Sequence, residues 1–432
     1  MLSTQENEQI SQVGPGTPAG KLMREYWLPM ATSDELVADG DPVRVRLLGE
    51  NLIAFRTTSG RVGLVDQFCP HRGTSLFFGR NEEEGIRCTY HGWKYDVSGE
   101  CLEMPAEPVE NKFKDKITLT AYPCVDRSGI VWTYMGPRAT PPALPLIEAN
   151  MGEGVSDVSR TLRYCNWLQA LEGDIDTAHS EYLHAPAVID VASMKPGTGM
   201  YYRHRLREIF KYEVRDTEFG TSYGANRPAE EGTTYWRIAH FLFPCFTMTP
   251  TPAAGSAQTI RMWIPVDDDH VLFWSIEASQ SERDRRGHEY QEGTSDWMGR
   301  YRPVQNIAND YQIDRTDQKT ETFTGIGGGF IMHDTMATES MGPTMDRSRE
   351  HLGASDAMII RTRKRIIDAV HAMQDGDVPP PGVDEPEVYG TRSGWMILPE
   401  GADWWEASAE LRTAFVAKRD ESEAVAALRG TK

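Results

Sequence analysis

The feature that most constrains this chain is a pair of short motifs, Cys-Pro-His at residues 69–71 and Cys-Thr-Tyr-His at residues 88–91. Two thiolates can hold one iron of a 2Fe-2S cluster while two neutral imidazoles hold the other, and this ligand set raises the reduction potential above that of an all-cysteine cluster. Gly73 and Gly92 follow the motifs and favour the tight loops that such a site needs. The expected cluster ligands are Cys69, His71, Cys88 and His91.

Zinc is the other metal that commonly binds two cysteines and two histidines, so a structural zinc site is an alternative interpretation of these motifs. The combination of Cys-x-His with Cys-x2-His is unusual for zinc and favours the cluster. Tyr90, Trp93 and Tyr95 lie within or just after the second motif, where they can shield a cluster and donate a hydroxyl to its sulfurs. We therefore predict a Rieske-type 2Fe-2S cluster.

The size and charge of the chain narrow its organisation and its partners. At 432 residues it exceeds the length at which one hydrophobic core usually stops growing, which predicts two domains. A net charge of −19 disfavours nucleic-acid binding, which needs basic patches, and suits a basic electron-donor protein. The other four cysteines show no paired spacing, and no signal peptide or membrane-spanning segment is evident. We expect a reduced, cytoplasmic protein that does not contact membranes.

Residue patterns divide the chain into two parts. Alternating apolar and polar residues over 43–61, broken by turn residues, predict β hairpins, and a further strand is expected over 129–134. Prolines at positions 137, 141, 142 and 145 cannot lie in a helix interior, which predicts a cluster domain over 1–145 and a second domain over 146–432. In the second domain the patterns predict helices over 164–183, 355–373 and 411–428, and strands over 235–249 and 258–277.

A second constellation lies in the run Asp176-x2-His179-x4-His184. Two histidines and one carboxylate can hold a non-haem ferrous ion and leave adjacent coordination positions open, and His179 and His184 match the histidine half of such a triad. A spacing of five residues does not place two side chains on one face of a regular helix. We therefore predict a distorted or π-bulged turn at this point, a feature that often marks functional sites.

Together, the cluster motifs and the run from Asp176 to His184 resemble those of the oxygenase α subunits of Rieske non-haem iron oxygenases, and the resemblance extends over nearly the whole chain. Segments 13–29, 332–336 and 346–353 are most similar to the phthalate dioxygenase branch. The resemblance implies an α+β fold with an N-terminal Rieske-type β domain and a C-terminal helix-grip catalytic domain of the START/Bet v 1 type, built on an antiparallel sheet. It also implies a mononuclear Fe(II) and head-to-tail trimers, single or stacked as hexamers, without a separate β subunit.

The third iron ligand must come from far along the chain, where Asp334, Asp346 and Asp356 are candidates. We choose Asp334 because it follows the apolar run 330–332, and because the family's ligand precedes a glutamate such as Glu339 by a few residues. Asp346 adjoins an arginine and is expected to be its salt-bridge partner, whereas Asp356 is typical of a helix start.

The same resemblance suggests how substrate and electrons reach the iron. A planar aromatic acid needs a cation, and Arg207 and Arg237 lie in segments similar to the sheet that lines the family's pocket, with Arg203 and Arg205 as competitors. The resemblance further implies that Asp176 is catalytic, by bridging His179 of one subunit and the cluster ligand of its neighbour. The basic run 361–365 is expected to lie on a solvated helix face, with reductase docking as the alternative.

These features predict the terminal oxygenase of a Rieske dioxygenase, which would cis-dihydroxylate an aromatic carboxylate, phthalate first, with O2. The glycine-rich stretch 325–329 lacks a dinucleotide fingerprint, so a separate NADH-dependent reductase with flavin and iron–sulfur groups is expected to supply electrons. Two alternatives remain open. One is a Rieske mono-oxygenase or O-demethylase that acts on a methoxy- or phenoxybenzoate, and the other is a non-catalytic Rieske electron carrier with a ligand-binding module.

Overall fold

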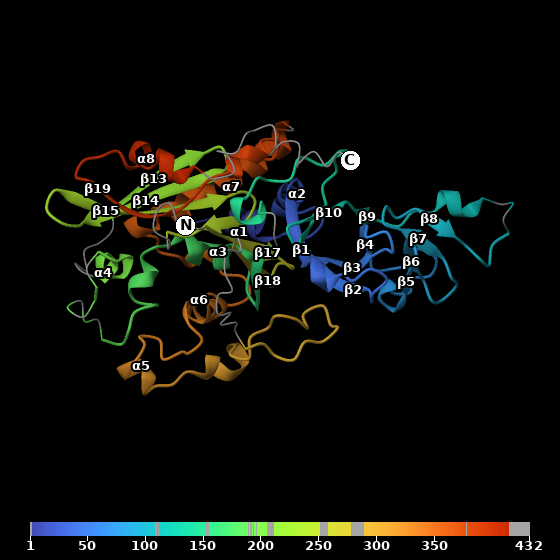
Figure 1. The fold of residues 1–432 in the computed structure, drawn as a ribbon, viewed down its shortest axis with the longest axis horizontal. Helices are drawn as coiled ribbons and strands as arrows, with labels where there is room; N and C mark the ends of the chain where they lie inside the picture. The colour runs from blue at the N-terminus through green and yellow to red at the C-terminus, as the bar shows by residue number, and fades with distance from the viewer. Residues whose placement is uncertain are drawn as a thin grey trace.

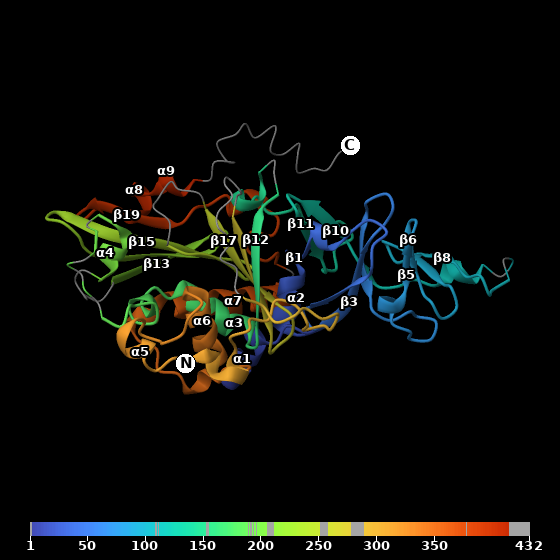
Figure 2. The ribbon, with the colours of Figure 1, turned by 60° about the horizontal axis from the view of Figure 1, so that its bottom comes forward.

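The computed structural model describes residues 2–413 except 109, 111, 153–154, 189, 191, 193, 196, 205–210, 251–257, 278–288 and 377. Within these residues the strands form four antiparallel sheets. The part with the two cysteine and histidine motifs projects from one end of the molecule, and the larger sheet and most helices form the other part (Figures 1 and 2). No described helix is both long and apolar enough to span a membrane.

Two small sheets build the projecting part. The first has the order β2 (Val43–Leu47), β3 (Glu50–Arg56), β4 (Val62–Asp66) and β9 (Ala121–Tyr122), and the second has the order β5 (Arg80–Glu82), β6 (Gly85–Arg87), β7 (Lys94–Asp96) and β8 (Cys101–Glu103). Strand β3 divides two cores because side chains alternate across a strand. Leu52 and Ala54 join the main core of the molecule, whereas Ile53 and Phe55 join a second core that contains Cys69.

A three-stranded sheet links this part to the rest of the chain. Its order is β1 (Trp27–Thr32), β11 (Ile130–Tyr134) and β10 (Cys124–Arg127). Trp132 of β11 is fully buried and packs edge to face against Phe246 of the large sheet, with ring centroids 6.5 Å apart. Helices α1 (Thr4–Ser11) and α2 (Pro18–Arg24) contact the long C-terminal helix α7 (Ala357–Gly376). One hydrophobic core therefore continues across residue 145, and the predicted boundary there stays a prediction.

The large sheet has eight strands. Their order is β12 (Asp157–Arg163), β18 (Val271–Glu277), β17 (Thr259–Pro265), β16 (Phe246–Met248), β15 (Thr233–Leu242), β14 (Gly220–Pro228) and β13 (Lys211–Thr217), and β19 (Gly394–Pro399) also pairs with β15. Helices α3 (Trp167–Ile175) and α7 contact each other and the same sheet, so they cover one of its faces. Helix α6 (Phe330–Glu339) packs against α3 on that side, and α8 (Trp404–Ala407) and α9 (Ala409–Arg412) lie across the other face (Figure 2).

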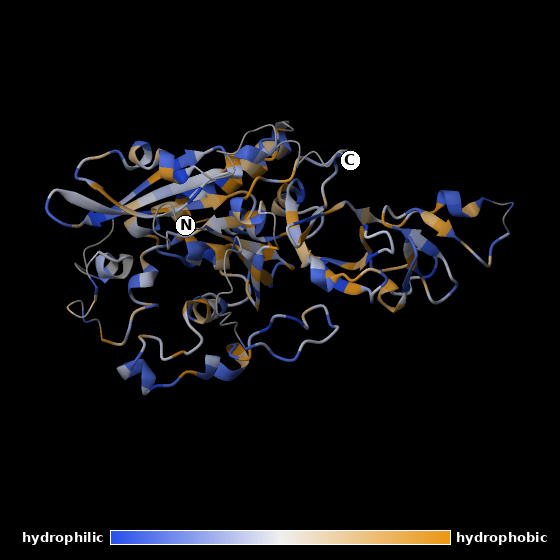
Figure 3. Ribbon diagram, viewed as in Figure 1, coloured by the Kyte–Doolittle hydropathy of each residue, from blue (hydrophilic) through white to orange (hydrophobic). Residues whose placement is uncertain are grey.

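Alternation along β15 decides which side chains face α3. Trp236 and Ile238 pack under Trp404 of α8 on the outer face. Tyr235 and Ala239 face the inner core, and Arg237 shares their side of the strand. Hydrophobic residues gather where this sheet meets its helices, whereas the outlying segment around α5 (Asp317–Thr320) is mostly hydrophilic (Figure 3).

The α+β class, with a β domain followed by a helix-covered antiparallel sheet, is confirmed. Two predicted helices differ from the structure. The helix expected over 164–183 is the shorter α3, which ends at Ile175. Of the helix expected over 411–428, the first two residues belong to α9 and residues from 414 onward lie outside the described part of the chain.

Candidate metal centres

Two backbone loops of matching geometry present the cysteine and histidine motifs. In each loop the cysteine N–H donates to a carbonyl five residues further on, at 3.0 Å for Cys69 and 2.8 Å for Cys88. The cysteine carbonyl in turn accepts from a glycine N–H, from Gly73 at 2.9 Å and from Gly92 at 3.0 Å. Both glycines have φ near +75°, which a residue with a Cβ rarely adopts. The glycines noted in the sequence thus close both loops.

The four expected cluster ligands lie at the tips of these loops. Cys69 and Cys88 are 2% exposed and their thiols are free, whereas His71 and His91 are partly exposed. The two imidazole rings lie edge to face with centroids 4.4 Å apart. Two thiols on the inside and two imidazoles toward the surface form the donor set of a Rieske cluster.

Neighbouring groups suit a sulfur-ligated cluster. The Tyr95 hydroxyl lies 3.4 Å from the Cys69 Sγ, and Trp93 stacks on His71 with centroids 4.3 Å apart. Burial raises the pKa of the Cys88 thiol, and the backbone N–H groups of Tyr90 and His91 act in the opposite direction by donating to its sulfur. Such donors stabilise a thiolate that is bound to metal.

The second centre joins residues that lie far apart in the sequence. His179, His184 and Asp334 each bring one ligand atom within 4.8 Å of the others. The His184 Nε2 lies 3.2 Å from the His179 Nε2 and 3.1 Å from the Asp334 Oδ1, and the His179 Nε2 lies 3.7 Å from the same oxygen. Two imidazole nitrogens and one carboxylate oxygen that converge in this way fit a non-haem ferrous ion.

The end of α3 explains how the two histidines meet. The Asp176 Oδ1 accepts a hydrogen bond from the Ala178 N–H at 2.7 Å, and this turn stops the helix. His179 then begins a short 3-10 turn, His179–Glu181. Of the predicted distorted or π-bulged turn, the π bulge is wrong, because the chain leaves the helix before the first histidine and the turn at His179 is a 3-10 turn. Asp334 arrives from α6, a helix that sequence patterns did not indicate.

Burial and neighbouring charges act in opposite directions on the pKa values of His179, His184 and Asp334. Burial lowers the pKa of His184, and its contact with Asp334 acts in the opposite direction. Burial also lowers the pKa of His179, but hydrogen bonding to Asp176 and the charge of Asp334 outweigh it and leave a net rise. Burial raises the pKa of Asp334, but the two histidines outweigh it and the net shift is downward. Asp334 is therefore held as a carboxylate, the form that binds a metal.

Asp176 lies beside this centre. Its Oδ2 is 3.5 Å from the His179 Nδ1, and its side chain is 22% exposed. Asp176 has an extended backbone (φ −92°, ψ 117°) at the end of α3, so it does not share a helical face with His179. One carboxylate edge nevertheless contacts the histidine while part of the side chain remains accessible.

The competing carboxylates lie elsewhere. Asp346 caps a 3-10 turn by accepting from the Ser348 N–H at 3.1 Å, and its predicted salt bridge to Arg347 is wrong because that arginine pairs with Glu172 at 3.1 Å. Asp356 accepts from the Gly353 N–H at 2.7 Å, just before α7. Neither belongs to the group of donors around His179 and His184.

Of the two predicted substrate arginines, the structure describes one. Arg237 is 6% exposed, and its Nε donates to the Thr177 Oγ1 at 2.6 Å. Among the described residues no carboxylate lies within ion-pair distance of its guanidinium. Arg207 and Arg205 lie outside the described residues, as does the side chain of Arg203.

An apolar cavity of about 860 Å³ opens beside His179. It is lined by Tyr182, Leu183, Ile313, Phe323, Ile326 and Met336, among others. Arg237 is not one of its lining residues. The cavity therefore gives an apolar approach to the mononuclear centre that is separate from the arginine.

Sequence reasoning missed two residues that adjoin this centre. Thr177 fixes Arg237, and the Nδ1 of His333 lies 3.4 Å from the His184 Nδ1. Both are direct neighbours in sequence of expected site residues, Asp176 and Asp334. That adjacency was the available signal.

Comparisons with known protein families cover most of the chain. A model described as Rieske [2Fe-2S] domain matches residues 26–123, and one described as LigXa C-terminal domain like matches residues 133–426. The 3-chlorobenzoate-3,4-dioxygenase oxygenase subunit of Comamonas testosteroni is 42% identical over 94% of this chain and 97% of its own. The phthalate 4,5-dioxygenase oxygenase subunit of Pseudomonas putida is 36% identical over 87% of this chain and 88% of its own.

Solved structures resemble the fold at low sequence identity. Dicamba monooxygenase bound to dicamba has a TM-score of 0.56 at 17% identity and covers 82% of this chain and 99% of that one. The oxygenase of carbazole 1,9a-dioxygenase, solved in complex with its ferredoxin, has a TM-score of 0.54 at 18% identity and covers 84% of this chain and 94% of that one. These likenesses support the fold.

Proposed function

The chain belongs to the Rieske non-haem iron oxygenases as an oxygenase α subunit, and from this premise we propose that it hydroxylates an aromatic carboxylate. It is an oxygenase whose cofactors are a Rieske 2Fe-2S cluster and a mononuclear iron. The zinc interpretation and the non-catalytic carrier are therefore wrong. Whether the product is a cis-diol or the result of mono-oxygenation is part of the proposal.

We assign the cluster to Cys69, His71, Cys88 and His91, and the mononuclear iron to His179, His184 and Asp334. When bound, the cluster supplies single electrons and the ferrous ion supplies the activation of dioxygen. The protein's part is to hold these groups, to bind the acid and to keep Asp334 ionised.

The observation that carries the proposal is the state of Arg237. Its guanidinium is buried, held by Thr177, and has no carboxylate partner among the described residues. A buried charge is costly unless it is paired, so such an arginine is suited to a carboxylate that comes with the ligand. Thr177 lies between Asp176 and His179 in the chain, which ties Arg237 to the segment that holds the iron.

The number of carboxylates on the substrate separates the two leading substrate classes. Phthalate carries two carboxylates and a chlorobenzoate carries one, so phthalate calls for a second cation beside Arg237. Arg207 is that residue in our proposal, and phthalate remains the leading substrate. The 3-chlorobenzoate named for the Comamonas testosteroni relative is the alternative that needs Arg237 alone.

Substrate-dependent oxygen uptake tests the proposal directly. The oxygenase would be supplied with a compatible NADH-dependent reductase and a panel of phthalates, halobenzoates, methoxybenzoates and phenoxybenzoates. A cis-diol product supports dioxygenation, whereas a phenol with an aldehyde supports the O-demethylase alternative. Uptake with none of these acids would contradict the aromatic carboxylate.

The Arg237→Gln variant tests the carboxylate contact. Loss of a charge-assisted hydrogen bond costs about 1.5 to 3 kcal/mol, so KM for the acid should rise roughly ten- to a hundredfold. Arg215→Gln is the matched control. Arg215 lies on β13, two strands from the β15 strand that carries Arg237, and it is exposed and pairs with Asp403 at 3.1 Å. If KM is unchanged in Arg237→Gln, the carboxylate site must be reassigned. If Arg207→Gln impairs phthalate but not 3-chlorobenzoate, two cations bind the diacid.

Electron delivery is proposed to cross between two copies of the chain. Strands β5 and β6, which lie between the two motifs in the chain, are in the projecting part, whereas α6 is in the larger part in both views (Figures 1 and 2). His91 is partly exposed and Asp176 is partly accessible, so a head-to-tail neighbour can bring them together. Trimers, single or stacked, would provide that contact, with a separate reductase as electron source. Asp176 would accept hydrogen bonds from His179 of one copy and His91 of the next.

The Asp176→Asn variant tests this bridge. It should keep both metals and the oligomer, while the reduced cluster should reoxidise more slowly when substrate and oxygen are mixed in. Asp310→Asn is a matched control, because Asp310 is an exposed carboxylate on the wall of the same cavity as His179. Stopped-flow absorbance of the cluster provides the measurement. Native reoxidation rates in a metal-replete Asp176→Asn protein would exclude the bridge.

A further inference from the structure

His333 is a buried histidine that the proposed chemistry leaves without a role. It is 4% exposed, and it lies one residue before Asp334 on α6. Its Nε2 lies 2.9 Å from the Ile326 carbonyl oxygen, and its Nδ1 lies 3.4 Å from the Nδ1 of His184. Each ring nitrogen therefore contacts a polar group: the Nε2 contacts a loop carbonyl, and the Nδ1 contacts a proposed iron ligand.

Hydrogen-bond donors and acceptors fix the protons of this pair. A carbonyl oxygen can only accept, so the Nε2 of His333 carries a hydrogen and donates it to Ile326. The Nδ1 of a neutral His333 is then an acceptor, and the His184 Nδ1 must donate to it. This leaves the His184 Nε2 without a hydrogen, with its lone pair toward Asp334 and His179. That is the tautomer that binds a metal.

One turn of α6 contacts the His184 ring in three ways. The Phe330 ring lies 4.7 Å from it between centroids, and the His333 ring stacks on it at 5.6 Å with an interplanar angle of 23°. Asp334 follows on the same turn. Residues three and four apart lie on one helix face, so Phe330, His333 and Asp334 all contact His184 from the same face of α6.

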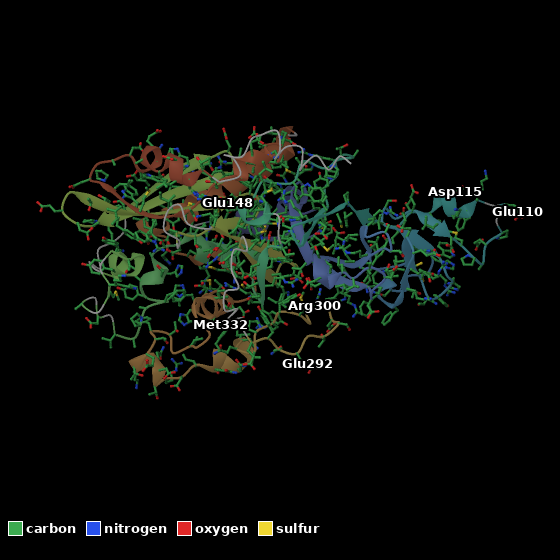
Figure 4. The ribbon with its side chains drawn as sticks, in the orientation of Figure 1. Glu110, Asp115, Glu148, Glu292, Arg300 and Met332 are labelled. Atoms are coloured by element: carbon green, nitrogen blue, oxygen red, sulfur yellow. The ribbon has the colours of Figure 1, made fainter. Side chains whose placement is uncertain are left out.

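The carbonyl that anchors His333 is itself held in place. Ile326 is 2% exposed and packs with Tyr311 and Met332 in a small apolar cluster, and Figure 4 labels Met332 on α6. Gly325, the preceding residue, accepts from the Asp314 N–H at 2.8 Å, and a Cβ on that glycine would lie 2.4 Å from the Asp314 carbonyl. The glycine-rich stretch therefore fixes the position of the acceptor at Ile326.

We infer that His333 is a positioning residue: it accepts a hydrogen bond from His184 and thereby holds that ligand in the tautomer and orientation that bind ferrous iron. This rests on the proposed ligand set. His333 is not itself a ligand, because it is outside the converging group of His179, His184 and Asp334. Partners of this kind are typically worth ten- to a hundredfold in metal affinity.

Two substitutions separate an acceptor role from simple filling of space. In His333→Asn the amide oxygen can take the place of the Nδ1 acceptor, whereas His333→Leu fills the site without one. Thr335→Val is the matched control, because Thr335 is also fully buried on α6 and its hydroxyl donates to the Ile331 carbonyl at 2.6 Å, away from His184. His184→Ala provides the reference for loss of a ligand.

The measurement is the ferrous-iron affinity of the full chain with its cluster intact. The mononuclear site would be emptied with a chelator and refilled anaerobically in competition with a metal-sensitive dye. We expect about ten- to a hundredfold weaker binding in His333→Leu, at most a few-fold change in His333→Asn, and no change in Thr335→Val. The cluster absorbance should remain in all of them.

The outcomes distinguish the inference from the proposal beneath it. If His184→Ala binds iron as the native protein does, the ligand set is wrong. If His184→Ala fails to bind and His333→Leu binds normally, His333 has no positioning role. Equal weakening in His333→Asn and His333→Leu, or weakening in Thr335→Val, would mean that packing of α6 matters and the acceptor does not. If His333→Leu does not fold, His333→Ala takes its place as the variant without an acceptor. Native iron affinity in His333→Asn with weaker affinity in His333→Ala would then support the acceptor role, and equal iron affinities in the two variants would overturn it.

Discussion

The cluster loops draw all four proposed ligands from residues 69–91, whereas the mononuclear centre joins residues 179–184 to Asp334 on a helix about 150 residues later. In the loops, the backbone of each motif closes on itself through a cysteine and a glycine. At the mononuclear centre, the two histidines follow one local turn after α3, but the third ligand comes from a separate helix. The position of Asp334 relative to His184 depends on how α6 packs against α3.

This difference assigns separate supports to the two centres. The cluster has its own small core, which contains Cys69 and Cys88 and is divided from the main core by β3. The mononuclear centre depends on buried ion pairs between segments far apart in sequence. Glu339 at the end of α6 bonds to Arg302 and Tyr311, and Glu172 of α3 bonds to Arg347 and to Arg363 of α7. Damage to one centre should therefore leave the other in place.

The largest expected effect tests that independence. Native protein should contain about three irons and two labile sulfides per chain. His179→Ala should lower this to about two irons, abolish turnover and keep the cluster spectrum. Cys88→Ser should bleach the cluster and leave about one iron. Metal and sulfide analysis beside visible absorbance gives the answer. Loss of both centres in either variant would break the comparison.

The next effect concerns the long-range support alone. Glu172→Gln removes a carboxylate partner from two buried arginines. Arg363 keeps Glu350, whereas Arg347 keeps no carboxylate among the described residues. Breaking such a buried pair typically costs about 3 to 5 kcal/mol. Burial raises the pKa of Glu172, but Arg347 and Arg363 outweigh it and lower the pKa, so the group is charged near neutral pH. We expect lower stability in urea unfolding and faster loss of mononuclear iron, with the cluster spectrum retained. Glu8→Gln, an exposed change on α1, provides the control and should alter neither.

The same contrast decides what could be predicted from sequence. The four cluster ligands were accessible because ligands and loop-closing glycines are neighbours in the chain. His179 and His184 were accessible as a motif, but the helix end between Ile175 and His179 was not, because it depends on the Asp176 side chain accepting from Ala178. Asp334 was chosen from three candidates because of the apolar run that precedes it and with help from family resemblance, since no local motif pairs it with the two histidines.

The basic run 361–365 shows a limit of a different kind. It was predicted to lie on a solvated face, and Arg361 does pair with Asp216 at the surface. Arg363 is instead 3% exposed and pairs with Glu172 at 2.6 Å. Two residues along a helix turn the side chain by about 200°, so a basic run cannot share one face. The buried partner lies nearly two hundred residues earlier, and sequence alone does not connect the two.

A third effect is the acid sensitivity of the catalytic sheet. His240 on β15 is fully buried, its Nε2 donates to the Arg392 carbonyl at 2.9 Å, and its Nδ1 lies 2.8 Å from the Ser222 hydroxyl. Burial lowers the pKa of His240 to about 4. Below pH 6.5 the unfolded chain binds a proton at His240 that the folded chain does not bind until about pH 4. The free energy of unfolding therefore falls as the pH drops.

The size of this effect follows from the pKa difference. Between pH 6.5 and 4 the loss from His240 should reach about 3 kcal/mol. Urea unfolding at several pH values would measure it in native protein and in His240→Asn, where other titrating groups contribute equally and the slope should be flatter. Parallel slopes would show that His240 does not produce the acid sensitivity of this sheet.

The smallest expected effect belongs to the cluster and tests whether its local surroundings tune it. The Tyr95 hydroxyl lies 3.4 Å from the Cys69 Sγ. Reduction adds negative charge to the cluster, so a hydroxyl that donates to sulfur stabilises the reduced form more than the oxidised form. Removing it in Tyr95→Phe should cost the reduced cluster about 1 kcal/mol, which lowers the reduction potential by on the order of 40 mV for a one-electron couple.

Tyr90→Phe is the matched control, because Tyr90 is 54% exposed and its hydroxyl contacts Arg72. A redox titration followed by absorbance should therefore give a lowered cluster potential in Tyr95→Phe alone, and the iron affinity of the mononuclear centre should be unchanged. An unchanged potential in Tyr95→Phe would mean that the contact to Cys69 does not contribute to the reduction potential of the cluster.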